Sequence, residues 1–264
     1  ARGRRDRGDG QRDQGDGRDG RSPDAARRVP RWLADLARAV RTRPLSSIHR
    51  HFVPGEDARR AAVLILFGED VHGPDVLLLE RAADLRSHAG QPAFPGGGVD
   101  PGDPSIAATA LPEAKEEVGL DPSGVEVLTT ASPLYLPPSR YLVTPVLAWW
   151  HTPCAVAPVD PAETSAVARV PIAELAEPAN RLLLQHPSGF HGPAFRVRQM
   201  LVWGFTAAIL DELLRLARWE RPWDSRTPVT DPRITAAFRA AQPRLPQEAV
   251  PPSDDPSRSE DPAR

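Results

Sequence analysis

A run of three glycines that leads into a short helix constrains this chain more than any other feature. The glycines at 96–98 let the backbone pass close to a ligand, because no side chain stands in the way. In residues 105–118 apolar side chains recur at helical spacing, and Gly119 follows where a helix would end. We expect Asp103 to cap this helix and Pro104 to lie in its first turn. The buried face should consist of Ala107, Leu111, Ala114 and Val118.

Three glutamates lie on the other side of this expected helix. At 100° per residue, Glu113, Glu116 and Glu117 point roughly 140° away from the apolar face. Like charges at this spacing repel one another, and Lys115 is not placed to relieve them. Three carboxylates in a partly closed cluster suit a hard divalent ion such as Mg²⁺ or Mn²⁺, which takes its other ligands from water and substrate phosphates. The alternative is a solvated acidic face, but the preceding glycine loop favours the metal site.

Short apolar runs on both sides of this stretch predict a mixed α/β domain. Residues 61–67 and 75–80 are typical of a strand pair joined by a turn. Further strands are expected at 125–130, 141–150 and 166–170, and helices at 31–41 and 200–217. Because strands and helices do not alternate regularly, we expect an α/β sandwich rather than a doubly wound parallel sheet.

The two ends of the chain differ from the middle in composition. Residues 1–28 hold nine Arg, six Asp and no large apolar side chain, and residues 242–264 are rich in Pro, Asp, Ser and Glu. Neither segment can offset its ordering entropy by burying apolar surface. We therefore predict two disordered tails around a folded domain at 29–241. The Arg-rich tail offers charge to a polyanion, but the interleaved Asp residues favour a solvated tail.

Composition also narrows the class of partner. The 33 Lys and Arg residues are balanced by 35 Asp and Glu, for a net charge of -2, so no basic excess favours nucleic acid. The longest apolar run, residues 61–67, is too short to span a bilayer. The single cysteine, Cys154, excludes an internal disulfide and a cysteine-based zinc cluster. We expect a cytoplasmic protein with neither nucleic acid nor membrane as a partner.

The glycine loop and the acidic helix together resemble the signature of the Nudix hydrolases. That signature places a glycine and a loop acid before a helix, which carries one glutamate, then a pair, and ends at a glycine and an apolar residue. The matching residues here are Gly97, Asp103, Glu113, Ala114, Glu116, Glu117, Gly119 and Leu120. The resemblance implies a Nudix fold, which is an α/β/α sandwich with a mixed sheet and the signature loop-helix-loop. It also implies that Glu113, Glu116 and Glu117 are catalytic residues and ligands of Mg²⁺ or Mn²⁺, joined by Glu163 from outside the helix.

Residues 77–97 are similar to a second motif, found in the coenzyme A diphosphatase branch of that family. The matching residues are Leu77, Leu78, Arg81, Ala82, Arg86, Gly90, Phe94, Pro95, Gly96 and Gly97, whereas Leu79 stands where Thr is typical. This resemblance implies hydrolysis of coenzyme A or its thioesters to 3′,5′-ADP and 4′-phosphopantetheine. Another nucleoside diphosphate derivative, such as ADP-ribose or NADH, is the first alternative. A catalytically impaired module that binds coenzyme A or a nucleotide is the second.

The same motif supplies candidates for substrate binding. Arg81 and Arg86 precede the glycine loop, and guanidinium groups bind phosphates bidentately, although an unmatched surface Arg is usually only solvated. His88, Gly96 and Gly97 complete the set, with a packed structural role equally open for His88. Glu163 has a structural alternative as well. Nothing in the sequence indicates an oligomeric state.

Pro112 departs from the signature at its centre, because the family has Arg at this position. Proline lacks a backbone N–H and its ring clashes with the carbonyl of Ala108, which costs ~3 kcal/mol or kinks the helix. Two outcomes are open. Either a mild bend still presents the three glutamates together, or the carboxylates are displaced and the site is weakened.

Overall fold

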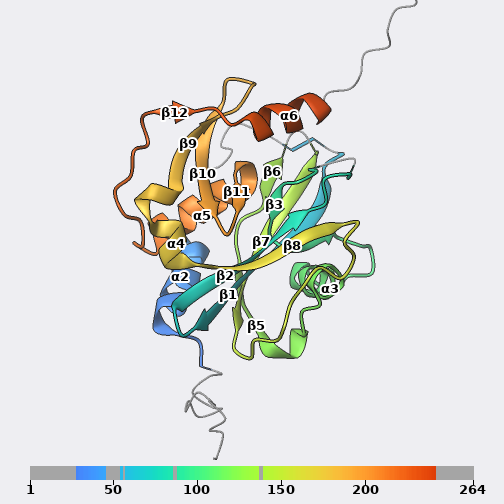
Figure 1. Cartoon of the computed structure of the whole chain (residues 1–264). Coiled ribbons are helices and arrows are strands. Elements are labelled where there is room, and N and C mark those ends of the chain that lie inside the picture. The colour runs from blue at the N-terminus through green and yellow to red at the C-terminus, as the bar shows by residue number, and fades with distance from the viewer. Residues whose placement is uncertain (1–27, 46–53, 56, 86–87, 137–138, 242–264) are drawn as a thin grey trace, which may run out of the picture.

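A mixed sheet forms the centre of the molecule. The computed structural model describes residues 28–45, 54–55, 57–85, 88–136 and 139–241 (Figure 1). Strands β1 (Arg59–Asp70) and β2 (Gly73–Arg81) form the expected antiparallel hairpin, and β1 also runs parallel to β7 (Tyr141–Trp150). The other strands pair antiparallel: β3 (Pro92–Ala93) and β8 (Thr164–Pro171) with β2, β4 (Gly96–Gly98) with β1, and β5 (Val125–Thr130) and β6 (Leu134–Leu136) with β7.

Alternating side chains give this sheet two apolar faces, and helices cover both (Figure 1). On one face, Ile65 and Phe67 of β1 pack in a core with α2 (Arg31–Thr42) and α5 (Gly204–Leu216). On the other face, Leu64 and Leu66 pack in a second core with α3 (Ile106–Val118). The sheet is therefore buried on both sides, and the predicted α/β/α sandwich with a mixed sheet is confirmed.

An aromatic cluster fixes the leading helix to the sheet. Trp32 of α2 makes edge-to-face contacts with Phe67, Trp149 and Trp219, at ring-centre distances of 6.0, 6.2 and 5.4 Å. Such pairs stabilise packing beyond the area they bury. The helix predicted at 31–41 is thus an integral part of the domain rather than an appendage.

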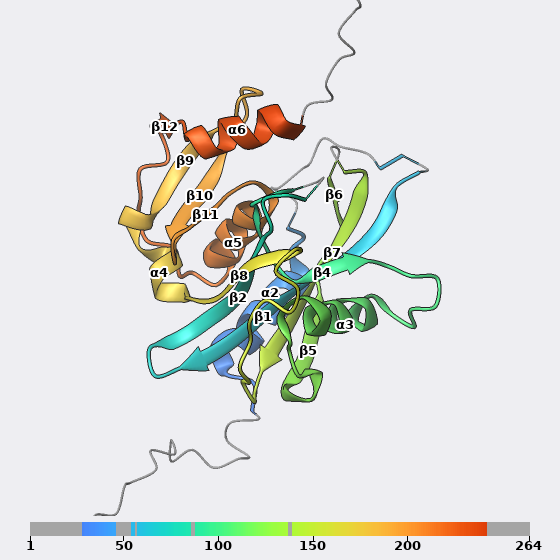
Figure 2. The ribbon, with the colours of Figure 1, turned by 45° about the vertical axis from the view of Figure 1, so that its right-hand side comes forward.

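A second, smaller sheet lies beyond α5, in a region for which no strand was predicted (Figure 2). It consists of β9 (Arg181–Gln185), β10 (His191–Val197), β11 (Met200–Val202) and β12 (Pro228–Val229). Helix α6 (Pro232–Ala241) packs on it through Ile234, and the short helix α4 (Ile172–Ala176) precedes it. Single-turn helices occupy Pro122–Gly124 and Pro178–Asn180.

The expected helix at 200–217 is wrong in its first four residues. Arg198 and Gln199 adopt left-handed backbone angles, with φ of 49° and 65°, and so turn β10 back into β11. Met200 to Val202 therefore pair as a strand, and the helix begins at Gly204. By contrast, the strands at 125–130 and 141–150 lie where they were predicted.

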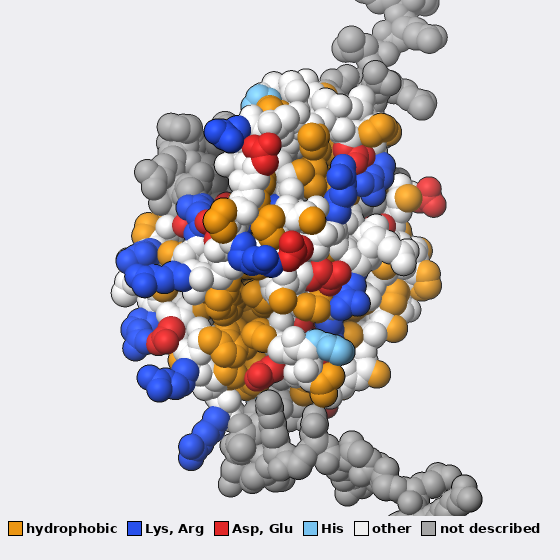
Figure 3. All heavy atoms as spheres, turned by 60° about the vertical axis from the view of Figure 1, so that its left-hand side comes forward, with side chains coloured by type: hydrophobic (Ala, Val, Ile, Leu, Met, Phe, Trp, Pro, Cys, Tyr) orange, Lys and Arg blue, Asp and Glu red, His pale blue; other side chains and the backbone are white. Residues whose placement is uncertain are grey.

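Three further observations concern the surface, the helices and the ends of the chain. On the face shown in Figure 3, basic and acidic side chains are interspersed around an apolar area. No helix in the described part of the chain combines the length and apolar character that crossing a bilayer requires. Apart from Arg28, the two predicted tails lie outside the described residues.

Candidate active site

Helix α3 carries the acidic residues and has well-defined ends. Ser105 is its N-cap, because the Ser105 hydroxyl accepts a hydrogen bond from the Ala108 N–H at 3.2 Å. Gly119 ends it in the left-handed region, with φ of 71°. The prediction that Asp103 caps the helix is wrong. Its carboxylate instead accepts from the Thr109 hydroxyl at 2.6 Å and from the Asp100 N–H at 3.0 Å, which closes the loop before the helix.

The glycine loop forms a short strand that only glycine permits. In β4, Gly96 pairs with Val63 of β1, and a Cβ on Gly96 would lie 2.2 Å from the Ala62 carbonyl oxygen. A Cβ on Gly97 would lie 2.2 Å from a carboxylate oxygen of Glu113. Both distances are far inside van der Waals contact, so any side chain here would displace β1 or the glutamate. The glycines let β1, β4 and α3 meet at one point.

Glu117 is the most buried of the acidic side chains on this helix, with 10% of its side chain exposed. Its Oε2 accepts a hydrogen bond from the Gly96 N–H at 2.9 Å, and its Oε1 lies 3.6 Å from Arg81 Nη1. Burial raises the pKa of the Glu117 carboxyl to about 7, against the opposing effects of the Gly96 N–H and the Arg81 guanidinium. A carboxyl that holds its proton near neutral pH lies at the centre of this site.

Two further carboxylates lie close to Glu117. The pKa of Glu113 is raised, first by burial and then by the charges of Glu116, Asp100 and Glu163. The charge of Glu163 also raises the pKa of Glu117. The backbone of Glu163 is held in place, because its carbonyl oxygen accepts a hydrogen bond from the Ala82 N–H at 2.8 Å. The structure thus brings the predicted residues Glu113, Glu117, Glu163 and Arg81 to one place beside Gly96 and Gly97.

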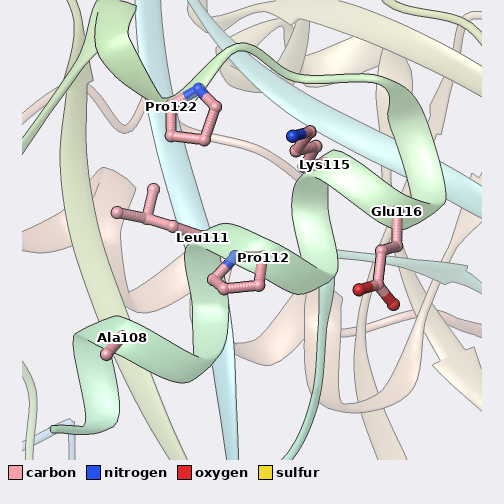
Figure 4. A pocket seen from close by; sticks show the side chains of 6 residues that line it. All are labelled: Ala108, Leu111, Pro112, Lys115, Glu116 and Pro122. Carbon is pink, nitrogen blue, oxygen red and sulfur yellow. The ribbon is translucent and has the colours of Figure 1, made fainter. Parts of the chain in front are cut away.

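Glu116 faces elsewhere. Successive helical residues point 100° apart, so Glu116 and Glu117 diverge, and Glu116 is exposed while Glu117 is not. Glu116 lines a shallow surface hollow together with Ala108, Leu111, Pro112, Lys115 and Pro122 (Figure 4). Of the three predicted glutamates, Glu116 is therefore the most exposed, although its charge still acts on Glu113. The buried face differs as well, because Thr109 and Ala110 are fully buried while Leu111 is partly exposed.

The remaining predicted residues are less informative. His88 is exposed in the loop between β2 and β3, with its Nδ1 3.0 Å from Gln91 Oε1. Arg86 lies outside the described residues. The sequence analysis missed the contact between Arg81 and Glu117. The alternation of β2 carried a signal for it, since Leu77 and Leu79 pack on the α3 side and Arg81 continues that face.

The donor atoms fit a hard divalent cation. The groups beside the glycine strand are carboxylates, the oxygen ligands that Mg²⁺ and Mn²⁺ prefer, and their raised pKa values reflect crowded negative charge. Across the described ranges, however, no three His, Cys, Asp or Glu side chains converge closely enough to form a ready metal-binding group. Glu113, Glu116, Glu117 and Glu163 would hold an ion only after rotation of their side chains.

Comparison with known proteins identifies the family. The NUDIX domain model matches residues 57–188, which is half of the chain. The protein called "Uncharacterized Nudix hydrolase NudL" from Photorhabdus laumondii is 41% identical over 145 residues, covering 53% of this chain and 75% of the relative. Its namesake from Escherichia coli O7:K1 is 41% identical over 162 residues, covering 59% and 81%. A solved Nudix hydrolase from M. smegmatis, RenU, aligns with a TM-score of 0.45 and 19% identity over 62% of this chain and 89% of its own.

The chain belongs to the Nudix hydrolase family, a class of enzymes that act on pyrophosphate bonds. Family members generally use divalent metal ions and act on small nucleotide derivatives. The signature helix and glycine strand of this class are the elements that meet at Glu117.

The burial of Glu117 makes a prediction about stability. The pKa of Glu117 is raised from 4.5 to about 7 on folding. The contribution of this carboxyl to the free energy of unfolding is therefore fully present below pH 4.5 and is lost as the pH rises through about 7. The loss for metal-free protein is up to about 3 kcal/mol. Glu117→Gln removes the charge, so we expect this variant to melt at a higher temperature than the parent at pH 8 in EDTA, and no higher at pH 5.

The exposed neighbour supplies the control for that measurement. Glu116→Gln removes one charge from the same turn of α3, where the carboxylate is already hydrated, and should change the melting temperature little. A Glu117→Gln protein that melts below the parent at pH 8 would refute the proposed cost of burying this carboxylate.

The position of Pro112 within α3 leads to a second prediction about stability. Pro112 lies on the exposed side of α3, and the helix continues through it, although the Ala108 carbonyl has no N–H to accept from at position 112. Replacement by Ala or Arg restores that donor and removes the ring. We expect both Pro112→Ala and Pro112→Arg to raise the free energy of unfolding by about 1–3 kcal/mol, measured by urea denaturation. If neither variant is more stable, the helix accommodates Pro112 without strain.

Proposed function

We propose that this chain hydrolyses the diphosphate of coenzyme A or its thioesters to 3′,5′-ADP and the (acyl-)4′-phosphopantetheine, with Mg²⁺ or Mn²⁺ as cofactor. One observation carries the proposal. The segment that resembles the coenzyme A diphosphatase motif, residues 77–97, places two of its residues on one glutamate of the signature helix. Arg81 lies 3.6 Å from Glu117 Oε1, and the Gly96 N–H donates to Glu117 Oε2. The two motifs therefore build one site rather than two.

The chemistry follows from the charges. A diphosphate is densely negative, and a bound divalent ion would neutralise it and favour attack of water on phosphorus. The space where side chains of Gly96 and Gly97 would stand is taken by β1 and the Glu113 carboxylate, whereas it is open at Gly98, so a phosphate group can approach the backbone there. One of the carboxylates beside the glycine strand would accept the proton of the attacking water at an oxygen atom. One P–O bond of the anhydride breaks, and the departing phosphate keeps the bridging oxygen.

Pro112 supports a second candidate, a module that binds the substrate without efficient turnover. Pro112 lines the hollow beside Lys115 and Glu116 and carries no charge (Figure 4). The site therefore lacks the charge that the signature Arg supplies at this position. Binding of coenzyme A without release of 3′,5′-ADP would favour this candidate.

A substrate panel tests the proposal. The full chain is incubated separately with coenzyme A, ADP-ribose and NADH, with Mg²⁺, Mn²⁺ or EDTA, and the products are identified by chromatography. We expect 3′,5′-ADP from coenzyme A only when metal is present. Glu117→Gln should lower the rate by a few orders of magnitude while the protein stays folded, because one charged ligand is lost. Turnover of ADP-ribose with none of coenzyme A would contradict the proposal.

A further inference from the structure

Arg81 has an unusual environment for a residue expected to bind substrate. Its Nη1 lies 3.6 Å from Glu117 Oε1, and its side chain is only 30% exposed. Its Nε is buried and has no hydrogen-bond partner among the residues that the structure describes. The guanidinium is thus largely withdrawn from solvent and directed at a carboxylate that is itself only 10% exposed.

The backbone around Arg81 fixes this direction. The pairing of β2 with β8 shifts register between Glu80 and Arg81, and such a bulge re-aims the side chains next to it. The Arg81 N–H donates to the Gln91 carbonyl at 3.1 Å, and the Arg81 carbonyl accepts from the Gly90 N–H at 3.1 Å. Arg81 is therefore held at a rigid point of the sheet, where the loop before the glycine strand closes on it.

The charges around Glu117 show why the direction of the Arg81 side chain matters. Glu113 and Glu163 both repel its carboxylate, and Arg81 is the cation that opposes them among the neighbours that act on it in the described structure. The other restraint is the single hydrogen bond from Gly96. Without Arg81, repulsion would drive the ionised Glu117 carboxylate, which predominates above about pH 7, away from its neighbours and off the Gly96 N–H.

We infer that Arg81 is a positioning residue, which holds the Glu117 carboxylate against the Gly96 N–H of the glycine strand. Its partner is a glutamate of the signature helix, rather than the substrate phosphates that the sequence analysis assigned to it. The inference rests on pyrophosphate hydrolysis at this site and is independent of coenzyme A as the substrate.

Amide hydrogen exchange of the metal-free protein tests the contact without any substrate. In Arg81→Gln we expect the Gly96 amide to exchange at least about tenfold faster, because its acceptor is no longer held in place. The Leu64 amide, which donates to the Pro95 carbonyl at 2.7 Å, is an internal reference and should change by less than about twofold. Arg140→Gln, which removes an exposed ion pair with Asp57, is the matched control and should leave both amides unchanged.

Steady-state kinetics at saturating Mg²⁺ tests the consequence for catalysis, with the preferred substrate of the panel. Arg81→Gln should lower kcat at least about tenfold with KM within about threefold, since a misplaced carboxylate affects the reaction more than substrate binding. Arg81→Lys keeps the charge and should retain more activity than Arg81→Gln. An unchanged Gly96 amide overturns the inference, and so does a faster Gly96 amide with unchanged kcat. A raised KM with an unchanged kcat would instead indicate that Arg81 binds the substrate, and would overturn the inference.

Discussion

The hydrogen bond from the Gly96 N–H to the Glu117 carboxylate joins the two halves of the site, and its geometry constrains the elements around it. For this contact to form, β4 must lie against β1 so closely that a Cβ on Gly96 would be 2.2 Å from the Ala62 carbonyl oxygen. Helix α3 must also approach β4 until the Glu113 carboxylate occupies the space of a side chain on Gly97. A larger residue at position 96 would push β4 from β1, and one at position 97 would displace the Glu113 carboxylate.

This arrangement buries acidic side chains, which costs free energy, and apolar packing on the same helix offsets that cost. Ala110, Ala114 and Val118 are fully buried against the sheet. Burial of apolar surface stabilises the fold by about 25 cal/mol per Å², so the helix stays docked although burial disfavours ionised Glu113 and Glu117. The result is a set of neighbouring carboxylates short of positive charge, whose side chains must rotate before they could hold an ion together. Such a set favours a divalent ion, and the strain is greatest when the ion is absent.

The sequence predicted the parts of the fold that depend on local patterns. Strands at 125–130 and 141–150 are bounded by strong turn residues and appear where they were expected. The small sheet of β9 to β12 was not foreseen, because its strands are short and its turn at Arg198 and Gln199 uses left-handed residues other than glycine. Residues 200–202 have a helical pattern but form a strand, because they pair with β10, and no local pattern reveals this pairing.

The candidate site, too, was predicted only where it depends on local patterns. Glu113, Glu116, Glu117 and the glycines were predicted from their spacing along one helix and one loop, whereas Glu163 was implied only by the family resemblance. The structure brings Glu113 and Glu163 near enough to Glu117 for their charges to raise its pKa. Glu116 points about 100° away from Glu117 on any α-helix, and its greater exposure depends on how α3 packs on the sheet. The alternation of β2 indicates that Arg81 lies on the α3 side, but its approach to Glu117 also depends on the register between β2 and β8 and on the bulge in it, and local patterns do not predict this long-range pairing.

Crystals soaked with Mn²⁺ and measured at the manganese absorption edge test most directly whether helix α3 and the glycine strand form a metal-dependent active site. We expect an anomalous peak between α3 and β4, in contact with the carboxylate of Glu117 and with at least one of Glu113, Glu116 and Glu163. Glu117→Gln crystals treated in the same way should lose or weaken that peak. A saturated crystal with no peak beside Glu117, or with its peak elsewhere in the molecule, would contradict the assignment of this site.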